Sequence, residues 1–247
     1  MQFSYIQHLE DELRERPAKQ KGQRTRERLK IATAKMLEQR GYHAMRVTDV
    51  TECAGVAEGS FYVYFKDKTD ASLTVLTGLI DHFMGLQASG ARGTTAFESI
   101  RADNRKWLAV GRANAGLMRC IFQLSDEAPE FAELSQRTNR SWFQRVAQSA
   151  MRRRPGEVDE AAVLLMVYML GAMMDDLLRK LSVYPDREFL ALVATLGLDD
   201  DAVADAASLA WVRLLYPDAP EPEGLPEPIV ALSHWLFAAP PARAPAG

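Results

Sequence analysis

The chain has 247 residues, a formal net charge of −3 and 47% hydrophobic residues. This length is sufficient for a second sizeable core beside a small N-terminal module, and the composition is that of an ordinary globular protein. Met1 to Arg16 lacks the basic and apolar regions of a signal peptide, and the longest apolar run, Ala161 to Met174, is shorter than the ~18 residues of a membrane span. We therefore expect a cytoplasmic protein with no membrane association.

The N-terminal part of the chain begins with an extension, residues 1–18. We expect it to be partly disordered, although Tyr5, Leu9 and Leu13 would share one face of a helix. Charge changes sharply along the sequence that follows. From Arg14 to Arg46 there are 11 Lys or Arg and 3 Asp or Glu, whereas from Pro155 to Gly247 there are 5 and 15. A basic N-terminal part on an acidic body indicates contact with a polyanion such as DNA at one end only.

Apolar spacing predicts a helix from Thr25 to Arg40, with Gly41 as a left-handed cap, and a second helix from Thr48 to Ala54. The basic run from Lys19 to Lys30 precedes these helices, and we expect it to bind phosphate. A second basic run, Arg152 to Arg154, is interpreted as a solvated helix face.

Residues 55–68 are the most informative segment of the chain. A turn at Gly55 precedes a short helix in which Phe61 and Phe65, four residues apart, can lock one face onto a small core. The other face carries small, hydroxyl-bearing and aromatic residues and is followed by Lys66 and Lys68. A second short helix with such a face is typical of a helix-turn-helix that enters the DNA major groove.

This N-terminal part resembles the DNA-binding domain of the TetR family of bacterial transcriptional regulators over Gln23 to Leu73. The resemblance rests on the following residues: Gly41-Tyr42, Val50, Ala54-Gly55-Val56, Gly59-Ser60-Phe61-Tyr62, Tyr64-Phe65 and Lys68. It implies an all-α protein, with a helix-turn-helix domain at residues 19–67, a ligand-binding and dimerisation domain at 68–216 and a Pro-rich tail at 217–247.

The resemblance and the charge pattern together give the predicted DNA-binding residues: Arg24, Arg46, Thr48, Ala57, Glu58, Gly59, Ser60, Tyr62, Val63, Tyr64 and Lys68. Two positions depart from the family pattern. Val47 stands where Thr or Ser usually caps the second helix, so Thr48 or Arg46 takes over its phosphate contact. Glu58 either accepts a hydrogen bond from cytosine N4 or is a first-turn residue favoured by the helix dipole.

The remainder of the chain reads as helix punctuated by Gly and Pro. The predicted helices are Lys68 to Gln87, Thr95 to Arg112, Ala115 to Leu124, Pro129 to Arg154, Val158 to Ser182, Arg187 to Leu196 and Asp200 to Tyr216. The helix from Val158 is apolar on nearly every side, and that from Asp200 carries Ala206, Ala207, Ala210 and Trp211. We expect these two helices to form the interface of a homodimer; the alternative is that they cover the chain's own ligand cavity. In the tail, Ile229 to Phe237 is apolar enough to dock on the body.

Methionines and aromatic residues of the body suit a lipophilic guest, although the same residues at helical spacing also build ordinary cores. The candidate ligand-binding residues are Trp107, Met118, Phe122, Trp142, Phe143, Met166, Met169 and Met173, with Tyr168 beside them. Nearby cations, Arg105, Lys106, Arg112 and Arg119, are either surface charges or partners for a carboxylate or a thioester-linked nucleotide.

Enzyme and metal motifs are missing from the sequence. The four histidines have no metal spacing, and neither a P-loop nor a nucleophile elbow is present. Asp175 and Arg179 are interpreted as an ion pair one helical turn apart, and Cys53 and Cys120 as separate small buried residues in a reducing compartment. We expect no catalysis, no cofactor and no metal.

The sequence thus predicts a regulator that binds a palindromic DNA operator as a homodimer. It is expected to act as a repressor released by a small lipophilic or acyl-CoA-type effector. The alternative is a constitutive DNA-bound regulator or adaptor that takes no effector.

Overall fold

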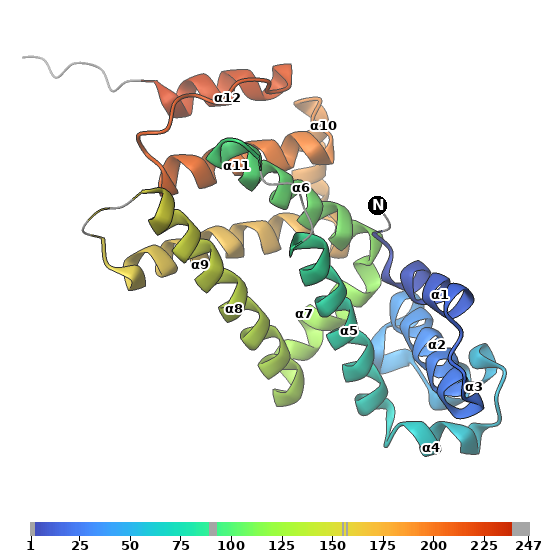
Figure 1. Ribbon diagram of the computed structural model, residues 1–247. Coiled ribbons are helices and arrows are strands. Elements are labelled where there is room, and N and C mark those ends of the chain that lie inside the picture. The colour runs from blue at the N-terminus through green and yellow to red at the C-terminus, as the bar shows by residue number, and fades with distance from the viewer. Residues whose placement is uncertain (1–2, 89–92, 155, 157, 239–247) are drawn as a thin grey trace, which may run out of the picture. The chain divides into compact units, whose positions relative to one another are not determined.

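The computed structural model describes residues 3–88, 93–154, 156 and 158–238. Throughout this part of the chain every regular element is a helix, so the predicted all-α class is confirmed (Figure 1). The helices form two compact units. Unit 1 comprises Met1–Gly90, Ala109–Trp142 and Leu178–Pro185, and unit 2 comprises Ala91–Leu108, Phe143–Leu177 and Asp186–Gly247. Each unit is described by itself.

The elements that lie wholly in unit 1 include the predicted helix-turn-helix. They are α1 (Tyr5–Glu15), α2 (Lys21–Ala44), α3 (Val47–Ala54), the 3-10 turn η1 (Glu58–Ser60), α4 (Phe61–Tyr64), α5 (Lys68–Ala88), α7 (Ala115–Glu127) and the π-helical turn η2 (Arg179–Val183). The regular backbone of α2 breaks at Gly41, where φ is 76° and ψ is 170°. The positive φ favours glycine as expected, but this ψ is not that of the predicted left-handed helical cap. Helical bonding then resumes as far as Ala44.

The long helix α2 is fastened to α7. The Glu38 carboxylate accepts hydrogen bonds from the backbone amides of Gly116 and Leu117, both at 2.9 Å, and so satisfies two amides that the start of a helix leaves without partners. A Cβ placed on Gly116 would lie 2.1 Å from the backbone oxygen of Glu38, so only glycine permits this approach. Burial of Cys120 in the same contact raises the pKa of its thiol to about 11. The predicted separation of the helix-turn-helix from the body at residue 67 remains a prediction, because α7 shares a compact unit with it.

The N-terminal extension is ordered, contrary to the expectation of partial disorder. Its residues 5–15 form α1, which packs on α2 and buries Tyr5 and Leu9. The predicted apolar face is therefore used, with Leu13 at its half-buried end. Burial raises the pKa of the Tyr5 hydroxyl. Residues 1–2 lie outside the described part of the chain.

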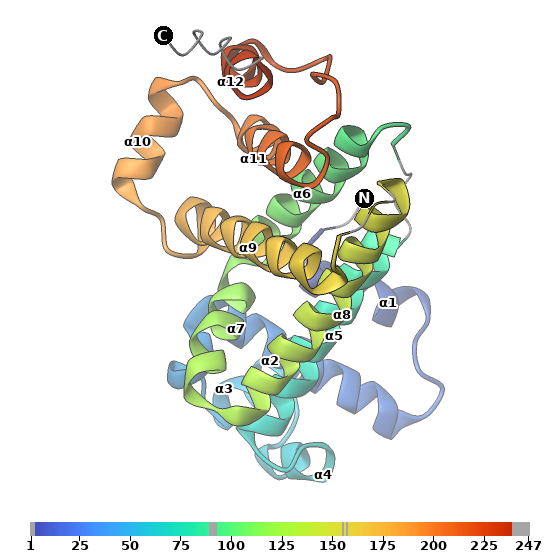
Figure 2. The ribbon, with the colours of Figure 1, turned by 90° about the vertical axis from the view of Figure 1, so that its left-hand side faces the viewer.

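Unit 2 contains the remaining helices, although the last residues of α6 and α9 and the first part of α8 belong to unit 1. They are α6 (Ala96–Ala113), α8 (Pro129–Arg153), α9 (Glu160–Leu178), α10 (Arg187–Thr195), α11 (Asp200–Leu215) and α12 (Glu227–Phe237). In both views α12 lies alongside α11 (Figure 2). Ile229 of α12 packs with Leu209 and Val212 of α11 and with Phe97 of α6 in one core. The apolar stretch of the tail therefore docks; residues 239–247 lie outside the description.

A buried carboxylate joins α6 to α11. The side chain of Asp205 is fully buried and accepts paired hydrogen bonds from two guanidinium groups, those of Arg101 and Arg105, at 2.6 to 2.8 Å. Arg105 also pairs with the exposed Asp201 at 3.1 Å. The hydrogen bonds to Asp205 raise the pKa of Arg105. Arg105 thus holds the fold together and is not the surface charge expected from the sequence.

One helical stretch, Glu160–Val183, is long and apolar enough by composition to cross a membrane, with a mean hydropathy of 1.8. Core and interface helices of globular proteins pass the same test, and Asp175 and Asp176 interrupt the apolar residues of this one. The burial of its individual residues is taken up with the proposed dimer below.

Candidate nucleic-acid interface

The turn of the helix-turn-helix is set by one glycine and one arginine. Gly55 ends α3 in the left-handed conformation, with φ 61° and ψ 46°, as the sequence predicts. The guanidinium of Arg28, on α2, donates to the carbonyl oxygens of Ala54 and Gly55. A cation at these carbonyls also matches the negative end of the helix dipole. Arg28 therefore fixes the end of α3, a role that the basic run around it concealed in the sequence.

The predicted recognition helix is shorter than its sequence suggested: a 3-10 turn, η1, leads into the single turn of α4. Phe61 and Phe65 are 1% and 2% exposed, and they hold this segment against the core of the unit. The opposite face stands free, with Tyr62 57% and Val63 74% exposed. Tyr62 and Val63 are adjacent on this face, so together they offer an apolar surface that a partner could contact.

Gly59 has no structural reason to be glycine. Its φ is not positive, and a Cβ placed on it would meet no atom within 4 Å. The residue lies on the exposed side of η1, between Glu58 and Ser60. A glycine without a conformational or packing role is expected where another molecule approaches the backbone closely.

Two predicted DNA-contact residues, Tyr64 and Lys68, are engaged within the chain. Tyr64 is half-buried, and its hydroxyl would lie 3.4 Å from a Cβ on Gly22, at the start of α2. The Lys68 ammonium donates to the carbonyl oxygen of Tyr42 at 3.0 Å and lies 4.4 Å from the centre of the Tyr42 ring. Both residues thus brace the unit, whatever they contact in a complex.

The start of α3 is capped in an unexpected way. Asp49 accepts a hydrogen bond from the backbone amide of Arg46 at 3.1 Å and pairs with Arg40 at 2.8 Å. Asp49 thereby supplies one half of a capping box, in which the third helical residue accepts from the amide before the helix. The side chains of Arg46 and Thr48 are left exposed, as are Arg24, Ala57 and Glu58. The two alternatives for Glu58, base contact or helix-start residue, stay open.

The basic run from Lys19 to Lys30 contains cations with contacts inside the chain and cations without them. Arg28 holds the end of α3, Arg26 lies 5.4 Å from the centre of the Phe65 ring, and Lys30 lies 5.9 Å from that of Tyr5. Within the described part of the chain, Lys19, Lys21 and Arg24 form no ion pair and are exposed. Three cations of the run thus have contacts within the chain, and phosphate binding by the run remains a prediction.

The predicted ligand-binding residues are divided between the units. Met118, Phe122 and Trp142 belong to unit 1, and Trp107, Phe143, Met166, Met169 and Met173 belong to unit 2. Phe143 packs against Tyr168, with ring centres 4.6 Å apart, and against Gly171. Met169 is 67% exposed in the monomer. All eight residues remain predictions.

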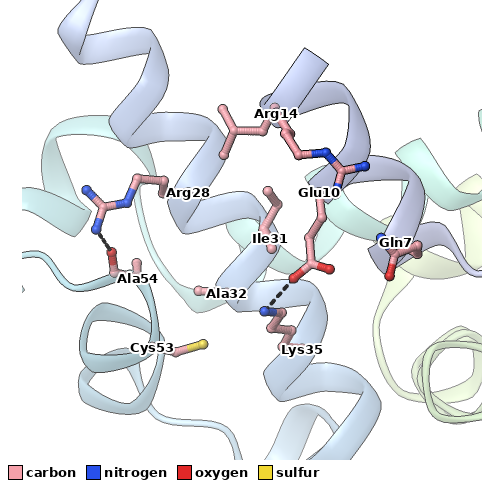
Figure 3. A pocket seen from close by; sticks show the side chains of 10 residues that line it. Gln7, Glu10, Arg14, Arg28, Ile31, Ala32, Lys35, Cys53 and Ala54 are labelled. Carbon is pink, nitrogen blue, oxygen red and sulfur yellow. Dashed lines mark hydrogen bonds and ion pairs between the residues drawn. The ribbon is translucent and has the colours of Figure 1, made fainter. Parts of the chain in front are cut away.

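A groove of about 490 Å³ lies in unit 1, between α1, α2 and α3 (Figure 3). Ile31, Ala32 and Leu13 contribute its apolar lining, and the Glu10–Lys35 ion pair at 2.6 Å crosses it. The hydrogen bond from Glu10 raises the pKa of Lys35. None of the predicted ligand-binding residues lines this groove. Cys53 does, and it is exposed, so the expectation of a buried thiol holds for Cys120 alone.

Comparison with known proteins gives a family match in the N-terminal part of the chain. Residues 31–70 match the family described as bacterial regulatory proteins, tetR family. A search of the curated proteins finds no match.

Solved structures resemble the fold over most of the chain. A transcriptional regulator from Rhodococcus sp. is 18% identical with a TM-score of 0.62, and the alignment covers 76% of this chain and 96% of that one. A putative regulator from Saccharomonospora viridis, in complex with choline, is 16% identical with a TM-score of 0.57 and coverages of 76% and 95%. The regulator FadR from Bacillus subtilis, in complex with stearoyl-CoA, is 15% identical with a TM-score of 0.53 and coverages of 78% and 98%.

Residues 31–70 are thus similar to the tetR family of bacterial regulatory proteins, and most of the chain shares its fold with solved structures of transcriptional regulators.

Proposed function

We propose that this protein is a cytoplasmic transcriptional repressor that binds a palindromic operator as a homodimer and is released by a small effector. The observation that carries the proposal is the free face of η1 and α4. Buried phenylalanines hold that segment from behind, while Tyr62 and Val63 project into solvent beside a glycine that the fold does not require. A single short segment reads few base pairs, so two copies related by symmetry are needed for tight and specific binding.

The exposed side of α9 supports the dimer. Its exposed residues follow a helical spacing and are mostly apolar: Ala161, Ala162, Leu165, Tyr168, Met169 and Ala172. Leu165 and Met169 are 64% and 67% exposed, which is expected of a helix whose partner belongs to another copy of the chain.

The part of the predicted interface on α11 is buried within the chain itself. Ala207 and Trp211 are 6% and 5% exposed within the chain itself, and α12 packs on the same helix. A charge at Ala207 would therefore disrupt the core and would not report on a dimer. We place the dimer interface on α9.

The effector is proposed from the body's composition and from two structural neighbours. One neighbour was solved with choline and the other with stearoyl-CoA, so proteins of this fold hold quite different guests. The Met and aromatic residues that unit 2 contributes to the predicted ligand set favour a guest with an apolar part, such as the acyl chain of an acyl-CoA.

Operator binding can be tested by selecting bound fragments from genomic DNA and footprinting them. We expect a protected palindrome and a Kd at least 100-fold below that for random DNA. Tyr62→Ala should reduce this difference without changing the helical circular dichroism. Equal affinity for all fragments would contradict the proposal.

Effector release can be tested on the same DNA complex. Mass spectrometry of molecules that co-purify with the protein supplies the candidates, and each is then added to the complex. A tenfold loss of operator affinity requires only ~1.4 kcal/mol of differential binding, so a modest preference for the released state is sufficient. Persistent binding with every co-purified compound would favour the constitutive alternative.

A further inference from the structure

The segment between α1 and α2 carries cations that the fold does not use. Arg16 and Lys19 are exposed and form no ion pair with any described residue. Their neighbours in sequence differ, since Arg14 pairs with Asp11 at 2.7 Å and Lys35 with Glu10 at 2.6 Å. The segment also precedes residues 31–70, the part that matches the family. The two cations are therefore available for an external partner; for Lys19 the sequence predicts phosphate, whereas Arg16 lies outside the predicted DNA-binding residues.

The first half of α1 anchors this linker to unit 1. The backbone amide of Tyr5 donates to the side-chain oxygen of Asn114 at 2.8 Å, and the Asn114 amide donates to the carbonyl oxygen of Phe3 at 2.8 Å. Leu9 is 3% exposed. A Cβ on Gly78 would lie 2.0 Å from the Tyr5 hydroxyl, so α5 leaves room for that ring only because it has glycine there.

The second half of α1 is held less firmly. It passes over the groove, where Figure 3 shows Glu10 and Arg14 above Ile31 and Ala32 of α2. The Glu10–Lys35 ion pair crosses this gap, and both side chains are about one-third exposed. Exposed pairs of this kind contribute ~0–1 kcal/mol, so the position of the linker depends on the anchor at Tyr5 and Leu9.

The linker leads directly to the recognition segment. Gly22 of α2 lies against the side chain of Tyr64. A Cβ placed on Gly22 would be 3.4 Å from the Tyr64 hydroxyl oxygen. Lys19 is three residues earlier, so its Cα lies within about 11 Å of that contact even if the chain is fully extended. A lysine side chain at this range can reach the DNA backbone that borders the site read by α4.

We propose that the linker carrying Arg16 and Lys19 is a second DNA contact, which binds phosphates beside the site of the recognition segment and is positioned by the docked helix α1. The proposal rests on the proposed function. Ordering a backbone residue costs about 1–2 kcal/mol, so a linker already fixed by α1 loses less freedom on binding than a loose tail does.

The first test replaces both cations, as Arg16→Ala/Lys19→Ala, and measures DNA affinity against salt concentration. Each lost phosphate contact lowers the slope of log K against log salt by about 0.9, so we expect a decrease of about 1.8 per head. The loss of affinity should be equal on operator and on random DNA, because phosphates carry no sequence. The control Arg152→Ala/Arg187→Ala removes the same charge from exposed positions of unit 2 and should leave the slope unchanged.

The second test keeps the charges and loosens the anchor. Leu9→Ala should speed hydrogen exchange in α1 and lower DNA affinity by about 3- to 10-fold while the salt slope stays that of the parent protein. Leu13→Ala, at a half-buried position on the groove, is the matched control and should have a smaller effect on both.

An unchanged salt slope in the double variant would overturn this inference while operator binding by the parent protein still stands. A loss confined to the operator would also overturn it, because that result indicates base readout. Absence of operator binding by the parent protein would instead remove the proposed function itself.

Discussion

A substitution at Gly59 should affect DNA binding and leave folding intact. Because a methyl group there meets nothing in the chain, Gly59→Ala should leave stability unchanged or raise it by up to about 1 kcal/mol. In a closely packed complex the same methyl group has no room, and overpacking of this kind costs about 1–3 kcal/mol. We expect operator affinity to fall roughly tenfold.

Gly85 provides the matched control for that measurement. It is exposed on α5, and a Cβ there also meets no atom within 4 Å. Gly85→Ala should change neither the affinity in a fluorescence-anisotropy titration nor the fold. Full operator affinity in Gly59→Ala would mean that the DNA does not approach the backbone of η1.

The buried carboxylate of Asp205 leads to a second residue-scale prediction. Asp205→Ala leaves two guanidinium groups without their anion, and breaking a buried pair costs about 3–5 kcal/mol. The arginine side chains are 23% and 31% exposed and regain some hydration, so we expect the lower end of that range in urea unfolding. Asp201→Ala should cost less than about 1 kcal/mol, because Asp201 is 60% exposed.

Replacing all three groups tests the cause. In Arg101→Met/Arg105→Met/Asp205→Leu no buried charge remains, and such exchanges are often neutral or stabilising. Recovery of the urea midpoint would attribute the loss to the unpaired guanidinium groups. If the triple variant were as unstable as Asp205→Ala, hydrogen-bond geometry would be the cause instead.

At the scale of elements, the exposed stripe of α9 makes the dimer testable. Leu165→Asp/Met169→Asp places two charges where an apolar partner is expected. Sedimentation should then show monomers that keep their helicity but lose operator affinity. Leu192→Asp/Leu196→Asp is the control, since Leu192 of α10 and Leu196, which follows α10, are 54% and 52% exposed and lie outside the stripe. Dimers that persist in the α9 variant would place the interface elsewhere.

Most helix positions could be predicted from the sequence. Which helices pack against one another could not. Gly41 and Gly55 ended helices where expected, because a positive φ is a local requirement that glycine meets. Which face of α11 is buried depends on α12, a helix that docks from beyond a Pro-rich stretch, and no local pattern records that contact.

The candidate site shows the same limit. The spacing of Phe61 and Phe65 was sufficient to predict which side of the recognition segment is free. Arg24 forms no ion pair with any described residue, whereas Arg28 holds the end of α3, and this distinction depends on where α3 ends in space. Tertiary contacts decide which cations of a basic run have a structural role. The sequence of the run does not indicate those contacts.

For the molecule as a whole, the contact of α2 with α7 decides how far the DNA-binding part is independent. Gly116→Ala would drive a methyl group into the backbone of Glu38, and displacement of packed elements costs about 1–3 kcal/mol. We expect a lower urea midpoint and weaker operator binding together. Gly85→Ala again serves as the control. A loss of stability without any loss of DNA affinity would show that α7 does not position the helix-turn-helix.

The same contact has a consequence for synthesis on the ribosome. The apolar side of α2 emerges early, but α7, which covers part of it, follows roughly 80 residues later, on the order of ten seconds at usual translation rates. The residues of η2 that complete the unit come later still. During that interval the unit that contains the helix-turn-helix lacks part of its core. If α7 positions the helix-turn-helix, a nascent chain gains DNA affinity only after α7 and η2 have emerged.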